Sequence, residues 1–338
     1  MSCGDSGSSR YEQVNVPDSP RTRLLIAYDG SSPARAAIAA AGALFPAANA
    51  AVAIVRPEPP TLEDRALARI AVPSEAIRAS LREMSRETLD AARATAMEGA
   101  ALARDAGLHA HPVTITGERP WRSLLSAAKD ADVLGCGTRG LGPLDRAVLG
   151  STASSLVHHT QLPLLVVPAS ANGLDGRLLV GYDGSEGARA ALAFAAERLR
   201  EHRLIVACAW RSPVRHSLRG RALLRSPETM SHDYAEGLDD VWREVAEDTA
   251  EEGTELARSL GLHAQSRAAE SGAGDAHALL EAARNVGAAA VLVGSRGRGA
   301  VAATVLGSVT SGLVHAGAMP VLIVPTRDEL LGAARDSG

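Results

Sequence analysis

The chain contains one sequence twice, and this duplication limits its possible folds more than any other feature. Residues 24–45 read LLIAYDGSSPARAAIAAAGALF, and they align without a gap to residues 178–199, LLVGYDGSEGARAALAFAAERL. A second pair, residues 137–168 and 294–325, shares a GxRG start, a central VLGS and a closing PxLxVP. The offset between the halves changes only from 154 residues at Asp29 and Asp183 to 157 residues at Gly137 and Gly294. The pattern predicts two copies of one domain rather than a short-period solenoid.

The expected domain boundary lies in the Gly-rich stretch Ala169–Gly176. A chain of 338 residues has the length of about two domains. We therefore predict domains over residues 21–169 and 176–327. Residues 1–20 are polar and rich in Gly, Ser and Pro, which favours a disordered N-terminal tail, and residues 328–338 form a short C-terminal tail.

Apolar runs alternate with helical patterns in each half, which predicts an α/β fold with a parallel sheet covered on both faces. In the first half we expect strands at Arg23–Tyr28, Ala51–Val55, His109–Thr116, Val133–Cys136 and Pro163–Val167, and helices at Ser32–Leu44, Ser74–Ala106, Trp121–Lys129 and Gly150–His159. In the second half we expect strands at Leu178–Tyr182, Leu204–Ala209, His263–Ala269, Ala290–Val293 and Val321–Val324, with a long helix near Asp233–Leu260.

Charge and cysteine content exclude several classes of protein. The formal net charge is -4 with acids and bases interspersed, which argues against a nucleic-acid binder. The three cysteines form no CxxC pair and fit a reducing compartment. No apolar stretch is long enough for a membrane span, and no export signal is visible. We expect a cytoplasmic protein.

A glycine-rich segment follows the fourth strand of each half and is the strongest candidate for binding chemistry. Its two copies are Gly137-x2-Gly140-x9-Gly150-Ser151 and Gly294-x2-Gly297-x9-Gly307-Ser308. Glycine lets backbone N–H groups approach an anion, and the start of the next helix favours phosphate. The alternative interpretation is a surface loop followed by an ordinary helix cap, and duplication would copy such a loop as well.

A second candidate is the turn after the first strand, Tyr-Asp-Gly-Ser, which contains Asp29 or Asp183. In open α/β sheets, ligands bind beyond the carboxyl ends of the strands where the strand order reverses. Each Asp would face the same crevice as the glycine segment and accept hydrogen bonds from a ribose or help to hold a metal. The alternative is that each Asp caps the following helix.

Together these motifs resemble the universal stress protein family over nearly the whole chain, twice. The resemblance implies two tandem Rossmann-like domains of the adenine nucleotide alpha hydrolase-like type, each with a five-stranded parallel sheet in the order 3-2-1-4-5. It implies pairing of the two domains within one chain, with a homodimer as a further possibility, and an unknown regulatory protein as partner.

In the ATP-binding branch of that family the glycine motif holds the phosphates, the strand-one Asp contacts the ribose, and the end of strand two contacts adenine. By resemblance, the nucleotide-binding residues of the first half are Ala27, Asp29, Val55, Cys136, Gly137, Arg139, Gly140, Gly150, Ser151 and Thr152. Those of the second half are Gly181, Asp183, Ala209, Val293, Gly294, Arg296, Gly297, Gly307, Ser308 and Val309. The implied cofactor is ATP with Mg²⁺; the metal ligands are unknown.

The sequence departs from the family pattern in ways that distinguish the halves. The first half has a glycine inside its fourth strand, and the second half lacks the Asp that precedes this strand in the first, Asp132. The two sites are therefore expected to differ in affinity. We expect Cys136 to be a small buried residue, and Trp210 either to stack on adenine or simply to pack.

No catalytic machinery is recognisable, since a Walker GxxxxGK[ST] motif and a G-x-S-x-G elbow are both missing. The favoured hypothesis is a nucleotide-dependent stress-response module. A slow ATPase, an interaction scaffold with empty sites, and a binder of AMP or cyclic AMP remain as alternatives.

Overall fold

The computed structural model describes residues 21–56, 75–140, 149–171, 176–212, 232–270, 272–297 and 306–326. The predicted tails at residues 1–20 and 328–338 lie outside these ranges. The first half consists of β1 (Arg23–Ala27), α1 (Ser32–Leu44), β2 (Asn49–Arg56), α3 (Glu75–Asp105), β3 (His109–Thr116), α4 (Pro120–Ala127), β4 (Val133–Gly137), α5 (Ser151–His159) and β5 (Leu164–Val167).

The second half repeats this order. It consists of β6 (Arg177–Gly181), α6 (Glu186–Arg198), β7 (Arg203–Trp210), α9 (His232–Ser259), β8 (His263–Glu270), α10 (Asp275–Asn285), β9 (Ala290–Gly294), α11 (Ser308–Ala316) and β10 (Val321–Val324). The expected elements are confirmed, with their ends shifted by one or two residues.

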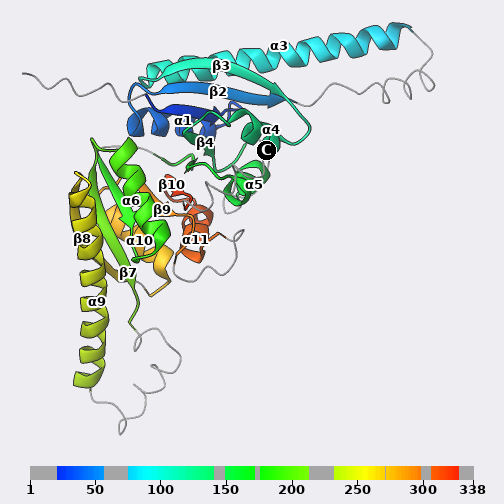
Figure 1. The fold of residues 1–338 in the computed structure, drawn as a ribbon. Helices are drawn as coiled ribbons and strands as arrows, with labels where there is room; N and C mark the ends of the chain where they lie inside the picture. The colour runs from blue at the N-terminus through cyan, green and yellow to red at the C-terminus, as the bar shows by residue number, and fades with distance from the viewer. Residues whose placement is uncertain are drawn as a thin grey trace, which may run out of the picture.

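All ten of these strands form one sheet in the order β3-β2-β1-β4-β5-β10-β9-β6-β7-β8. Each half is parallel and has the predicted 3-2-1-4-5 order, and β5 meets β10 in antiparallel register, with Leu165 opposite Leu322. Figure 1 shows β2 and β3 in the blue-to-cyan part of the chain and β7 and β8 in the part coloured green to yellow. Both joining strands are apolar and buried along their whole length. An unpaired apolar edge would expose backbone donors and acceptors, so each edge is covered by the other half. The two domains are thus paired within one chain.

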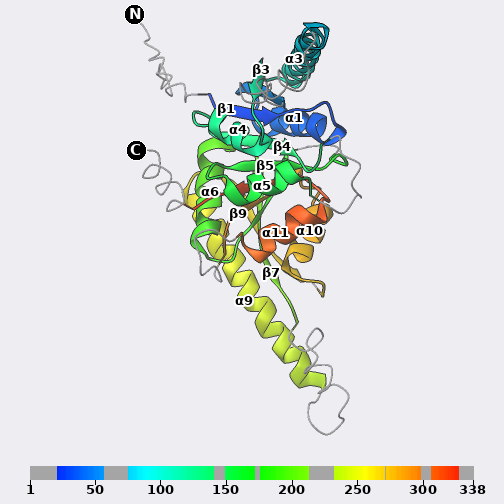
Figure 2. The same ribbon diagram turned by 90° about the vertical axis from the view of Figure 1, so that its right-hand side faces the viewer.

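The helices cover both faces of the sheet, which explains why the central strands are apolar without alternation. One core cluster lies between the sheet and α1, α3, α6 and α9, and it runs through both halves. A second cluster lies on the opposite face beneath α4, α5, α10 and α11. Figures 1 and 2 show α9 extending well beyond the sheet edge.

Direct contacts between the halves add to the shared sheet. The rings of Phe45 and Phe194 meet edge to face with centroids 6.5 Å apart. The Arg198 guanidinium of the second half lies 3.6 Å from the Asp132 carboxylate of the first. Asp132 also accepts the backbone N–H of Arg23 at 2.8 Å, so this carboxylate connects the start of β1 to the partner domain.

Candidate functional site

The carboxyl ends of β1, β2 and β4 open into a cavity of about 360 Å³, within the size range of small-ligand sites. All the first-half candidates from the sequence line it: Ala27, Asp29, Val55, Cys136, Gly137, Arg139, Gly140, Gly150, Ser151 and Thr152. The cavity lies at the switch point of the sheet, where β1 has β2 on one side and β4 on the other.

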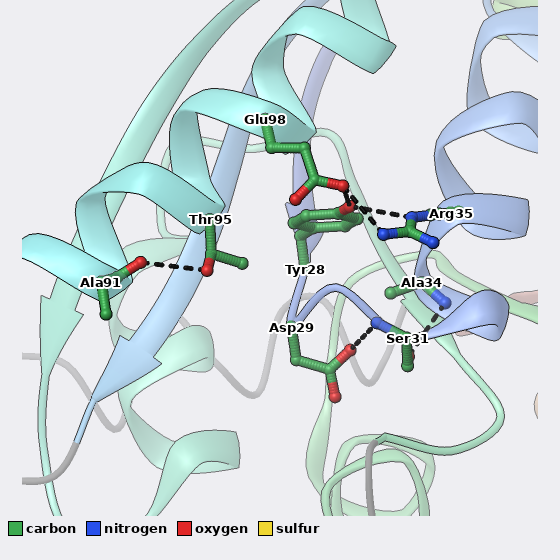
Figure 3. Close-up of polar contacts among 8 residues, drawn as sticks. All are labelled: Tyr28, Asp29, Ser31, Ala34, Arg35, Ala91, Thr95 and Glu98. Carbon is green, nitrogen blue, oxygen red and sulfur yellow. Dashed lines mark hydrogen bonds and ion pairs between the residues drawn. The ribbon is translucent and has the colours of Figure 1, made fainter. Parts of the chain in front are cut away.

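The turn after β1 holds the Asp29 carboxylate at the cavity. Gly30 has φ +81°, a left-handed conformation that glycine adopts without strain. Asp29 Oδ1 accepts the backbone N–H of Ser31 at 3.0 Å, and Ser31 Oγ accepts the N–H of Ala34 (Figure 3). Ser31 is thus the N-cap of α1. The interpretation of Asp29 as the helix cap is wrong, because the serine two residues later has that role.

The glycine segment closes on itself where it enters α5. The N–H of Gly150 donates to the carbonyl of Thr138 at 2.9 Å, which brings both ends of the segment together; residues 141–148 between them lie outside the described ranges. Gly150 is the N-cap of α5, and no side chain caps this helix. Among the described residues, the first N–H groups of α5 therefore have no side-chain acceptor and can donate to an anion.

Close packing explains two of the glycines in this segment. A Cβ on Gly137 would lie 2.7 Å from the carbonyl carbon of Pro33, and a Cβ on Gly140 would run into the Asp29 carboxylate. Gly137 thus packs on the backbone at the start of α1, and Gly140 packs on the Asp29 side chain, so a larger side chain at either glycine would separate these segments.

Arg139 supplies the only guanidinium among the described residues that line the cavity. Its Nε is buried and has no hydrogen-bond partner among the described residues, although its backbone carbonyl accepts the hydroxyl of Ser31 at 3.3 Å. A buried donor without a partner is costly, and a phosphate oxygen is a suitable acceptor for it. The residues present thus fit a phosphorylated ligand.

A three-residue network supports the turn from the opposite side. The Tyr28 hydroxyl donates to Glu98 on α3 at 2.9 Å, and Arg35 of α1 donates to both groups, at 3.3 Å and 2.9 Å (Figure 3). The bonds from Tyr28 and Arg35 lower the pKa of Glu98, and burial raises the pKa of Tyr28. The same network recurs as Tyr182, Glu252 and Arg189.

The second half keeps the backbone frame of the site. Ser185 donates its N–H to Asp183 at 3.0 Å, and Gly307 closes its loop on the Ser295 carbonyl at 2.8 Å. Gly294 packs on Gly187, and a Cβ on Gly297 would lie 2.8 Å from Asp183 Oδ2. Arg296 and Ser308 sit at the positions of Arg139 and Ser151.

The side chains around this second frame differ from those of the first half. Val293 stands at the position of Cys136, Val309 at that of Thr152, and Ala209 at that of Val55. At Gly181, the position of Ala27, a Cβ would lie only 2.9 Å from Leu279 Cδ1 and 3.0 Å from Val293 Cγ1. Leu279 and Val293 thus occupy the space beside Gly181 that a larger residue at this position would need.

Two further sequence expectations are settled by burial. Cys136 is buried, and desolvation raises the pKa of its thiol to about 12, which leaves the thiol protonated. Trp210 packs with Cys208, Ala246 and Ala250 beneath α9. Ala209, the counterpart of Val55, contacts the other core cluster, so Trp210 lies on the opposite face from the crevice and does not stack there.

Part of the cavity was not predicted. The additional lining residues are Tyr28, Ala34, Ala53, Ile54, Pro120, Leu124 and Ala153. Pro120 and Leu124 come from α4, for which the sequence motifs gave no signal, because the position of α4 depends on the sheet order. Ala53 shares the face of Val55 by the two-residue period of a strand, which was the available clue.

Comparison with known families agrees with this geometry. The profile of the Universal stress protein family matches residues 20–168 and again residues 176–325. The chain belongs to the universal stress protein family. It contains two such domains in tandem, as the internal repeat predicted.

Individual relatives show the same family. A universal stress protein of Mycolicibacterium smegmatis is 32% identical over 211 residues, which cover 61% of this chain and 66% of the relative. A universal stress protein of Mycobacterium tuberculosis is 27% identical over 210 residues, or 60% and 65% of the two chains. The matched regions thus span slightly less than two thirds of these relatives.

Solved structures match the fold as well. A universal stress protein from Archaeoglobus fulgidus superposes with a TM-score of 0.54 at 18% identity and covers 90% of this chain and 98% of its own. A universal stress protein in complex with cAMP covers 46% of this chain and 99% of its own, with 23% identity and a TM-score of 0.32.

Proposed function

We propose that this universal stress protein binds an adenine nucleotide, ATP with Mg²⁺, in the first-half cavity and acts as a nucleotide-dependent stress-response module. The observation that carries the proposal is the Nε of Arg139, which is buried at this cavity and has no hydrogen-bond partner in the part of the chain that the structure describes. Arg139 lies in the same segment as the N-terminus of α5, whose N-cap, Gly150, offers no capping side chain. Both are donors suited to phosphate.

Different residues of the cavity would bind the phosphates, the ribose and the adenine. The N–H groups of the glycine segment and of α5, together with Ser151 and Thr152, would hold the phosphates. Asp29 would accept hydrogen bonds from the ribose hydroxyls. Adenine would lie between the end of β2 at Val55 and the α4 side chain Leu124, both of which line the cavity.

The metal would arrive with the triphosphate. Among the described residues, no group of three or more His, Cys, Asp or Glu side chains is arranged to hold a metal ion. Asp29 is the only carboxylate that lines the described cavity. Mg²⁺ commonly takes one or two carboxylates plus substrate phosphates and water.

We propose that the second half binds the same ligand more weakly. Leu279 and Val293 crowd Gly181 there, and Val309 lacks the hydroxyl that Thr152 offers. The packing at Gly181 leaves less room for a ligand, and the missing hydroxyl removes one hydrogen-bond donor, while the backbone hydrogen bonds of the site are kept.

The first test is to denature freshly purified protein and identify the released small molecules by mass spectrometry. Recovery of ATP supports the proposal, whereas recovery of AMP or cyclic AMP shifts it to those ligands. A nucleotide-free preparation is next titrated with Mg-ATP, AMP and cyclic AMP by calorimetry, and the absence of heat with all three would leave the scaffold interpretation.

Slow ATP hydrolysis is tested separately. Steady ADP formation that is lost in a Gly150→Val variant would identify the protein as a weak ATPase. ATP that stays intact while bound supports a binding module.

A further inference from the structure

At the opposite end of the second-half sheet, three basic side chains form a row. Arg177, Arg203 and His263 are the first residues of β6, β7 and β8, and the parallel register places Arg177 beside Arg203 and Arg203 beside His263. Laterally paired residues of parallel strands project to the same face about 4.8 Å apart. Adjacent like charges in such a row are destabilising.

The first half shows how such a row is neutralised. Its corresponding residues are Arg23, Asn49 and His109. Asp132 pairs with the Arg23 guanidinium at 3.1 Å, and Asn49 adds no charge. The N–H of Asp132 donates to the Arg23 carbonyl at 2.8 Å.

The second half has the same backbone but lacks the carboxylate. The N–H of Ala289 donates to the Arg177 carbonyl at 2.8 Å, so Ala289 occupies the position of Asp132. Arg177 donates one N–H to the Val286 carbonyl at 3.2 Å. Arg203 replaces Asn49, and its exposed side chain makes no contact with a carboxylate among the described residues.

The row borders a cavity of about 490 Å³. Its described lining is Arg177, Arg203, Leu204, Ile205, Arg258, Leu262, His263, Ala264 and Gln265, which contains no carboxylate. Arg258 pairs outside this lining with Glu251 at 3.0 Å. Three guanidiniums, one of them paired with Glu251, and an imidazole thus line a space whose described lining contains no carboxylate.

We infer that this cavity binds a small anion of the phosphate class, which supplies the negative charge that Asp132 supplies in the first half. Guanidinium forks match the oxygens of phosphate and can hold two at once. The cavity has room for a linked polyphosphate. This site lies at the amino ends of the second-half strands, whereas the proposed nucleotide cavity lies at the carboxyl ends of the first-half strands.

The test is a calorimetric titration of the full chain with inorganic phosphate and, separately, with tripolyphosphate. Two variants copy the first half: Ala289→Asp adds the missing carboxylate, and Arg203→Asn removes the unpaired charge. Each should weaken binding at this site at least about tenfold, the usual scale for hydrogen bonds to charged groups. His109→Gln, in the matched row of the first half, is the control and should leave binding unchanged.

Tighter binding of tripolyphosphate than of phosphate identifies a linked polyphosphate as the preferred ligand, and equal binding identifies a single phosphate group. The glycine segments also attract phosphate, so the assignment rests on the heat that disappears in the two variants. A second readout is thermal unfolding: phosphate should raise the Tm of the unmodified protein more than that of Arg203→Asn. Equal heats and equal Tm shifts in all four proteins would overturn the inference.

Discussion

The hydroxyl of Tyr28 donates a hydrogen bond of 2.9 Å to the carboxylate of Glu98, 70 residues further along the chain. Tyr182 and Glu252 repeat this bond with the same length and the same separation. Tyr28 immediately precedes Asp29, so the bond connects α3 to the turn that holds the proposed ribose contact. The network therefore helps to hold the turn that carries Asp29.

Replacing Tyr28 with Phe should raise the pKa of Glu98 toward its ordinary value, because the Tyr28 bond is the largest cause that lowers it. Because the pKa of Glu98 is lower in the folded than in the unfolded state, its ionisation stabilises the folded state at pH values above the unfolded pKa of about 4.5. This stabilisation is lost as the pH falls through the folded-state pKa. The Tm of the variant should therefore lie further below that of the unmodified protein at pH 7 than at pH 3. Carboxyl resonances in an NMR titration and Tm values measure the two effects.

Tyr182→Phe is the matched variant: it should raise the pKa of Glu252 and leave the pKa of Glu98 at its value in the unmodified protein. If the pKa of Glu98 in Tyr28→Phe equals that in the unmodified protein, the network does not act as described.

Gly99→Ala should destabilise the protein although alanine favours helix. A Cβ at this α3 position would lie 2.5 Å from Tyr28 Cδ1 and 2.8 Å from Val52 Cγ1, and overpacking of this kind costs about 1–3 kcal/mol. Gly237 on α9 is the control, since nothing lies within 4 Å of a Cβ there, and Gly237→Ala should stabilise by about 0.5–1 kcal/mol. Urea unfolding measures both, and stabilisation by Gly99→Ala would show that Tyr28 does not pack as described.

Native Cys136 should resist alkylation at pH 8. Burial raises the pKa of its thiol from 9.0 to about 12, so the reactive thiolate is scarce. Mass spectrometry after iodoacetamide treatment of a Cys3→Ser variant measures this, with denatured protein as the positive control. Cys136 modified as fast in the native as in the denatured protein would contradict its burial.

The fold was predictable because its signals are local. Eight apolar runs marked the central strands and their neighbours, the edge strands β3 and β8 are more polar, and the repeat showed where the second domain begins. Gly107, which follows α3, has φ +86°, the left-handed conformation in which glycine commonly ends a helix. The antiparallel pairing of β5 with β10 was expected only as domain pairing, because the sequence does not state which edges meet.

The parts of the site that belong to recognisable sequence motifs were predictable. The glycine segment and Asp29 lie together because both follow central strands. The Tyr28–Glu98–Arg35 network was not found, since its members are far apart in the chain and individually ordinary. Their recurrence as Tyr182, Glu252 and Arg189 at a constant offset was an available signal. The crowding of Gly181 by Leu279 depends on helix placement, which single residues do not reveal.

No helix in the part of the chain that the structure describes combines the length and apolarity of a membrane span.

The most direct test of the account is a calorimetric titration of nucleotide-free protein with Mg-ATP, comparing the unmodified chain with Arg139→Met and Arg296→Met. We predict that Arg139→Met weakens the tightest site at least about tenfold, the scale of a hydrogen bond to a charged group, and that Arg296→Met leaves this site unchanged. Tight binding that survives Arg139→Met, or is lost only in Arg296→Met, would contradict the assignment of nucleotide binding to the first half.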